Sequence, residues 1–203
     1  YLYCKSHQSC ASGIHALIRD NKQRFSVYNL PNIGRESHTY LTHIINHYDH
    51  LPNRTIFTMG SLNISWLREL SLRYSLADVG DMRYCHKFKA SEISDLATYE
   101  VVPGKHPVSL GDGYNVYEQR DIIPARIRPL GNWLKNVADI DLLTLRSRCG
   151  WGKHGAIFSA DRAMLHGLTK NQYLKLLEEN SQGDSLEAGY YLEVSWRFLL
   201  GQL

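Results

Sequence analysis

The residues best suited to chemistry directly follow three segments that have the composition of β-strands. Lys5 follows the first of these segments, Asn32 and Arg35 follow the second, and Gly60 and Ser61 follow the third. In an open α/β sheet, ligands bind beyond the carboxyl ends of the parallel strands. We therefore expect these polar residues to meet at one edge of a sheet.

The second of these places, residues 32–36, has the composition of an anion site. Gly34 would let the backbone approach a ligand, and the helix that follows begins with unpaired N–H groups. Arg35 could add a bidentate contact to a phosphate. The alternative is an ordinary helix start, in which Glu36 interacts favourably with the helix dipole.

Histidines recur along that helix. His38 stands in its first turn, and His43 and His47, four residues apart, could share a metal ion. Ile44 stands where the HExxH motif has glutamate, so a zinc-protease reading has little support. We expect these histidines to form a solvated polar face, with a metal-dependent hydrolase as the alternative.

The C-terminal third contains the remaining candidates. Trp151 and His154 stand in a glycine-rich approach to a strand, and a tryptophan there could stack on a sugar ring. Glu187 and Glu193 flank Tyr190 on an expected helix, and either carboxylate could act as a general base. The alternative is an ordinary amphipathic helix. GxGxxG, GxxxxGK[ST] and GxSxG motifs do not occur, which disfavours dinucleotide, P-loop and serine-hydrolase sites.

Composition narrows the class of protein. The 203 residues carry a net charge of +3, too small to indicate a nucleic-acid partner, and no apolar run is long enough to span a membrane. The four cysteines form no CxxC pair, so we expect a reducing, cytoplasmic location. Two glycosylation sequons, at Asn53 and Asn63, would matter only in a secretory route.

The elements that would position these residues alternate in type. Strands are predicted over residues 1–4, 25–30 and 55–59, and helices over residues 12–20, 35–51 and 62–74. Such a β-α-β-α-β order predicts a central, mostly parallel sheet flanked by helices, an α/β fold.

The second half of the chain is less regular. Residues 78–131 read as a loop-rich stretch, with short strands at 99–102 and 115–117. Regular structure returns with a strand over residues 155–159 and helices over residues 170–180 and 186–200. No domain linker is evident, so we expect a single domain.

Several of these segments together resemble a known family. They include Asn32-Ile33-Gly34-Arg35-Glu36-Ser37-His38-Thr39-Tyr40-Leu41 and the tail Glu187-Ala188-Gly189-Tyr190-Tyr191-Leu192-Glu193. The chain is similar to a group of fungal, bacterial and algal-viral proteins that carry a domain of unknown function and resemble glycosyltransferases of the A type (GT-A). The resemblance covers about half of the positions and spans the whole chain.

The resemblance implies a single GT-A-like domain, with a nucleotide-sugar half over residues 1–76 and an acceptor half over residues 77–203. It implies a glycosyltransferase that moves a sugar from a UDP-sugar to a glycan or glycoprotein. The expected roles fall into three groups: nucleotide-sugar binding by Lys5, Asn32, Arg35, Glu36, His38, Gly60 and Ser61; acceptor binding by Trp151, His154 and Tyr190; and catalysis by Glu193 and Glu187.

Two features depart from the family pattern. The family carries an Asp-x-Asp metal motif where this chain has Met59-Gly60-Ser61, so the Mn²⁺ or Mg²⁺ that the resemblance implies has no assigned ligands. Other carboxylates, Asp78, Asp81 and Asp112, are not at that strand end. The family also opens with an additional strand, and this chain begins at the next one. The alternative function is a non-catalytic carbohydrate- or nucleotide-binding module on the same scaffold.

Overall fold

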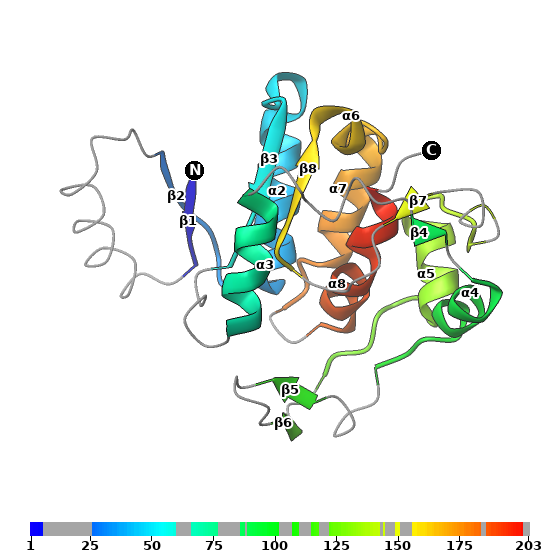
Figure 1. Cartoon of the computed structure of the whole chain (residues 1–203). Helices are drawn as coiled ribbons and strands as arrows, with labels where there is room; N and C mark the ends of the chain where they lie inside the picture. Colours follow the sequence, from blue (N-terminus) through cyan, green and yellow to red (C-terminus); the bar gives the residue numbers. More distant parts are fainter. Residues whose placement is uncertain are drawn as a thin grey trace.

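The computed structural model describes residues 1–5, 26–59, 66–76, 86–87, 89–101, 107–109, 115–117, 122–142, 144, 149–150, 156–183 and 186–200. Helices and short strands alternate along these residues, which makes the fold mixed α/β (Figure 1). The helices are α2 (Arg35–His47), α3 (Trp66–Leu76), α4 (Ala90–Ala97), α5 (Leu130–Val137), α6 (Arg162–Leu165), α7 (Lys170–Glu179) and α8 (Glu187–Leu199).

The strands of this described part pair in twos. β1 pairs with β2 in parallel, with Leu2 opposite Val27, and the other pairs, β3–β8, β4–β7 and β5–β6, are antiparallel. The strands are β1 (Leu2–Cys4), β2 (Val27–Asn29), β3 (Arg54–Phe57), β4 (His86–Lys87), β5 (Pro107–Ser109), β6 (Asn115–Tyr117), β7 (Cys149–Gly150) and β8 (Phe158–Asp161).

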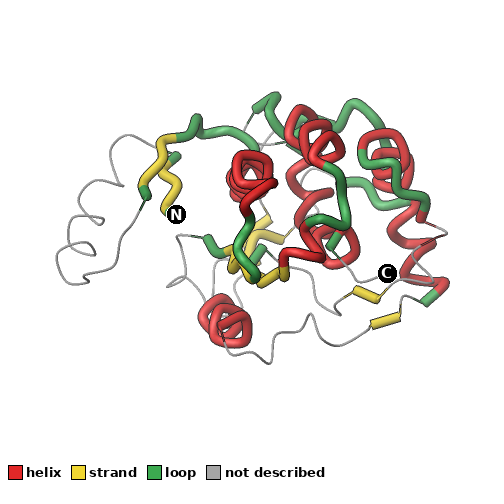
Figure 2. The backbone as a smooth tube through the Cα atoms, turned by 90° about the horizontal axis from the view of Figure 1, so that it is seen from above, coloured by secondary structure: helices red, strands yellow, loops and turns green. Residues whose placement is uncertain are grey.

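The large central parallel sheet expected from the sequence is not found among the described residues. β3 pairs with β8 and not with β2, and the β1–β2 pair lies apart from it at one edge of the molecule (Figures 1 and 2). The physical reason lies in the side chains. All three residues of β2 are exposed, whereas Phe57 of β3 packs on Phe158 of β8 with ring centroids 5.0 Å apart. The apolar strands therefore pair with each other.

Helix α2 forms as its periodicity predicts. Its apolar side chains Tyr40, Leu41, Ile44 and Ile45 are buried. The α-helix ends at His47, earlier than the predicted Leu51, because the chain tightens into a 3₁₀ turn at Tyr48–His50 before Pro52.

One hydrophobic core joins the two halves of the chain. α2 packs against α7 and α8, while α3 lies against β8. The largest fully buried side chains include Trp133 of α5 and Trp196 of α8. α7 begins with a capping box, in which Thr169 and Gln172 satisfy each other's backbone N–H groups. This core holds α2 and α8 side by side, and these two helices supply most of the candidate site.

The loop-rich prediction for residues 78–131 is wrong in part, because α4 and the start of α5 form there. Both helices have eight residues, too few for a clear periodicity in the sequence. The predicted strand at 115–117 is confirmed as β6, whereas residues 99–101 form no strand. The predicted helix over residues 12–20 lies outside the described residues.

Candidate functional site

The candidate site lies where β1 ends and α2 begins. Because β1 and β2 are parallel, the residues that follow both strands lie at the same edge. The ammonium group of Lys5 donates hydrogen bonds to the carbonyl oxygens of Ile33 and Arg35. The structure thus brings two of the three predicted strand-end segments together. Asn32 is exposed beside them, and the third segment, Gly60 and Ser61, lies outside the described residues.

Gly34 is the residue that precedes α2, and its backbone conformation sets the direction in which the chain enters the helix. Its φ is 60°, in the left-handed region that favours glycine, and its N–H donates to the carbonyl of Gly183 at 2.8 Å. Its own carbonyl accepts from Nδ2 of Asn180 at 2.9 Å, and a Cβ added at Gly34 would stand 2.1 Å from the Asn180 carbonyl oxygen. The sequence suggested that this glycine admits a ligand. In the structure, the absence of a side chain at Gly34 instead allows the backbone at the end of α7 to approach closely.

Arg35 extends from this turn toward α8. Its φ of 51° is also positive, which is unusual for a residue with a side chain. The guanidinium carbon lies 4.9 Å from the centroid of the Tyr190 ring, and Nε lies 3.9 Å from Oε2 of Glu36. About a third of the Arg35 side chain is exposed. The predicted residues Arg35, Glu36 and Tyr190 therefore form one cluster, although Arg35 and Tyr190 are 155 residues apart in the sequence.

His38 lies in the first turns of α2, close to Gly34. It is 7% exposed, and its buried Nδ1 has no hydrogen-bond partner. Burial, followed by the charge of Lys5, lowers the pKa of His38 to about 4. The imidazole is therefore neutral at neutral pH.

Glu193 is half-buried on α8, one turn beyond Tyr190. Its charge adds to burial in raising the pKa of Tyr99 to about 12. The pKa of Tyr40 is raised by burial and then by the charges of Glu36 and Glu193. Two carboxylates, one on α2 and one on α8, therefore lie near the same tyrosine beside the Arg35–Tyr190 pair.

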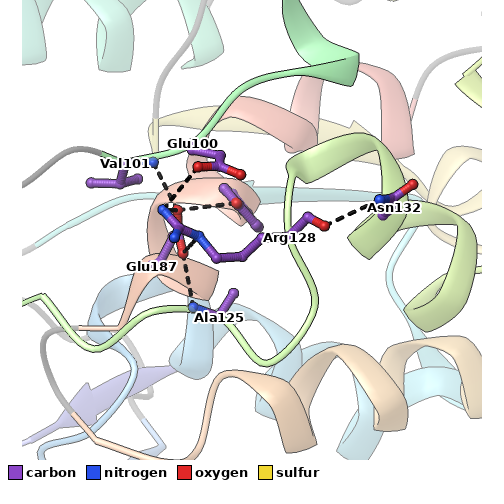
Figure 3. Close-up of polar contacts among 7 residues, drawn as sticks. Glu100, Val101, Ala125, Arg128, Asn132 and Glu187 are labelled. Atoms are coloured by element: carbon purple, nitrogen blue, oxygen red, sulfur yellow. Dashed lines mark hydrogen bonds and ion pairs between the residues drawn. The ribbon is translucent and has the colours of Figure 1, made fainter.

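Glu187 occupies a different position. Its side chain is 0% exposed, and it accepts hydrogen bonds from the backbone N–H groups of Val101 at 2.7 Å and Ala125 at 2.8 Å (Figure 3). Tyr191 donates its hydroxyl at 3.0 Å, and Nε of Arg128 lies 2.9 Å from Oε2. Both oxygens are engaged by the protein, so the predicted role of Glu187 as a general base does not fit this arrangement.

Sequence reasoning missed three residues of this region. Arg128 pairs with both Glu187 and Glu100, Tyr191 donates to Glu187, and Asn180 anchors Gly34. The i, i+4 spacing of Glu187 and Tyr191 was a usable signal. The partners of Asn180 and Arg128 are far away in sequence and left no such pattern.

The histidines of α2 are not the solvated face that the sequence suggests. His43 is 6% exposed, and its Nδ1 lies 2.8 Å from the hydroxyl of Tyr3 on β1. Burial, followed by the charge of His47, lowers the pKa of His43 to about 4. The two rings lie 4.7 Å apart. Within the part of the chain that the structure describes, no group of three His, Cys, Asp or Glu residues is placed to hold a metal ion.

Other predicted site residues, Trp151 and His154, lie outside the described residues, as do Asp78, Asp81 and Asp112. Cys4, which precedes Lys5, is disulfide-bonded, a bond that the sequence interpretation does not expect. None of the described helices combines the length and apolar character needed to cross a membrane.

The comparisons identify one similar family. Residues 14–81, a third of the chain, match the model of a family described as a protein of unknown function, DUF3431. The matched stretch contains the 32–41 block and the whole of α2. No curated protein and no solved structure matches the chain.

Proposed function

We propose that the protein is a glycosyltransferase that transfers a sugar from a UDP-sugar to a glycan or glycoprotein acceptor. One observation carries the proposal: Lys5, Arg35, Glu36 and Tyr190 converge at the carboxyl end of a parallel strand pair, beside the start of α2. The scaffold would be GT-A-like, with β1 and β2 as its parallel part and the acceptor side in the second half of the chain.

The proposed chemistry begins with the diphosphate. As the donor bond breaks, negative charge develops on the leaving UDP. Arg35 can offer N–H donors to a phosphate, and Lys5 adds a second positive charge within the same turn. The exposed side-chain amide of Asn32 would supply an uncharged N–H donor at the edge of this cluster.

Glu193 is the proposed general base. It is half-buried, whereas Glu187 is fully engaged by the protein, so Glu193 is the better placed of the two to take a proton from an acceptor hydroxyl. Tyr190, one turn earlier, would present an aromatic face to a sugar.

The described residues do not fit a Mn²⁺ or Mg²⁺ site. Met59, at the position of the family's metal motif, has no carboxylate, and the described residues offer no group of three suitable ligands. In the proposed mechanism, the positive charge at the site therefore comes from Arg35 and Lys5.

Calorimetric titration with UDP and a panel of UDP-sugars tests this proposal, each with and without Mn²⁺. We expect saturable binding of at least one donor. If neither UDP nor any UDP-sugar binds in either condition, the proposal is wrong.

A non-catalytic binding module on the same scaffold is the second candidate. It is favoured by Met59 at the motif position and by the engaged carboxylate of Glu187. Slow release of UDP from the bound donor, measured over hours, separates the two. A transferase hydrolyses some donor in water, and a binding module hydrolyses none.

We propose a secretory location for the protein, on the basis of Cys4. Disulfides persist in oxidising compartments, so the disulfide at Cys4 favours a secretory route over the cytoplasm. The sequons at Asn53 and Asn63 agree with this proposal. A glycan or glycoprotein acceptor would be met along the same route.

A further inference from the structure

A cavity of about 310 Å³ lies where the end of α7 meets the start of α8. It is lined by residues 123–126 and by Glu178, Glu179, Gln182, Leu186 and Ala188. Its volume is at the lower end of the range for small-molecule pockets. The residues that line it include none of those proposed above for nucleotide-sugar binding, so it is a separate place on the molecule.

Part of the cavity lining is apolar. Leu186 and Ala188 are buried at 4% and 1% exposure, whereas Pro124 and Ile123, the β-bridge partner of Leu186, are exposed. This surface can cover a short aliphatic chain, because removing apolar area from water is favourable.

The cavity lining also carries charge. Glu178, Glu179 and Gln182 line it together with Arg126, so it contains two carboxylates and one guanidinium. Arg126 donates to Oε1 of Glu179 from a side chain that is 74% exposed. The local charge therefore sums to one uncompensated negative charge.

Glu179 is the unusual member of this set. Its side chain is only 8% exposed, yet Oε2 receives no hydrogen bond from any described residue. The side chains of Glu178 and Gln182, which line the same cavity, receive none either within the described part. Oε2 of Glu179 can therefore accept a hydrogen bond from a ligand that enters the cavity.

We propose that this cavity binds the ammonium group of a small aliphatic primary amine. An ammonium carries three N–H donors, which match Oε2 of Glu179, the carboxylate of Glu178 and the amide oxygen of Gln182. Its carbon chain would lie on Ile123 and Leu186, and its charge would compensate the excess negative charge. This proposal does not depend on the proposed transferase activity.

Titration with n-butylammonium chloride, followed by two-dimensional ¹H–¹⁵N NMR of the full chain, tests the proposal, with n-butanol as the uncharged control. We expect saturable shifts in the amides of residues 123–126, 178–182 and 186–188. Glu178→Gln, at an exposed position, and Glu179→Gln should each weaken binding about tenfold. Asp95→Asn, which removes one exposed carboxylate on α4, should leave it unchanged.

Three results would overturn the proposal. The first is the absence of shifts at these amides. The second is equal binding of n-butanol, which would show that the cavity binds apolar groups without recognising charge. The third is unchanged affinity in a folded Glu178→Gln variant. The last variant keeps the test decisive if Glu179→Gln fails to fold.

Discussion

The carboxylate of Glu187 and the guanidinium of Arg128 form an ion pair, with Nε 2.9 Å from Oε2, in which the carboxylate is completely buried. Arg128 extends to Glu100 at 3.2 Å, and Glu187 accepts from the backbone N–H groups of Val101 and Ala125. The pair therefore ties the start of α8 to two segments of the chain, around residues 100 and 125. Its role is to hold α8 in place, and α8 carries Tyr190 and Glu193.

Glu187→Gln should destabilise the protein by about 3 kcal/mol, because a buried carboxylate that accepts two backbone N–H groups is removed and an amide N–H₂ group is turned toward those donors. Urea unfolding of the variant and the wild type measures the difference. Asp95→Asn, an exposed carboxylate on α4, is the matched control and should change stability by less than about 0.5 kcal/mol. Equal stability of Glu187→Gln and wild type would show that the network contributes nothing.

Gly34→Ala should be strongly destabilising. The new Cβ would stand 2.1 Å from the Asn180 carbonyl oxygen, at a φ of 60° that disfavours a side chain. The left-handed conformation and the overlap together cost about 2–5 kcal/mol. Thermal unfolding checks this, with Gly167→Ala as the control, since a Cβ there meets its nearest atom at 3.0 Å and its φ is not in the left-handed region. A variant as stable as wild type would contradict the close approach of α2 to the end of α7.

Acid should destabilise the fold between about pH 6.5 and pH 4. Burial lowers the pKa of both His38 and His43 to about 4. In the unfolded chain the pKa of the same groups is about 6.5, so the unfolded state binds more protons than the folded state between about pH 4 and pH 6.5. The stability that these neutral imidazoles contribute is present above about pH 6.5 and is lost as the pH falls through about 4.

Denaturation at a series of pH values measures this loss. His43→Phe removes one of the two groups and should flatten the pH dependence, whereas His50→Gln, at an exposed position, should leave it as in wild type. A dependence that is equally steep in His43→Phe would mean that other groups cause the acid loss.

The sequence predicted the elements whose signals are local. α2 follows its apolar periodicity, α7 forms within the predicted segment 170–180, and the strand before Lys5 forms as expected. The pairing of β3 with β8 could not be predicted, because Phe57 and Phe158 are about 100 residues apart and no local pattern specifies their contact. The same limit explains why the described strands form no central sheet, since the composition of a strand does not specify its partner strand.

The site was predictable to a similar degree. The strand-end rule places Lys5 beside the 32–36 segment, and the structure agrees. Glu187 and Glu193 have the same residue type on the same helix, and only the tertiary structure distinguishes them. The backbone N–H donors to Glu187, from Val101 and Ala125, lie 86 and 62 residues away in the sequence. The residues next to Glu187 in the sequence therefore do not indicate that it is buried.

Glu193→Gln should lower the rate of sugar transfer by at least about a hundredfold, which is the usual contribution of a positioned general base. Because Glu193 is half-buried and Gln has nearly the same shape, the variant should fold and should still bind the donor. Turnover, measured as UDP release with acceptor present, is compared with donor affinity in the same preparation. Wild-type turnover in the variant would remove Glu193 from the proposed mechanism.

Binding of a nucleotide sugar by the cluster around Arg35 can be tested by calorimetric titration of UDP-sugar into wild type, Arg35→Ala and Arg162→Ala. Arg162 is an exposed arginine on α6 and serves as the charge-matched control. We predict that Arg35→Ala weakens binding by at least about tenfold through loss of charge-assisted contacts to the diphosphate, while Arg162→Ala binds as wild type does. Equal affinity in all three proteins would show that Arg35 does not bind the diphosphate.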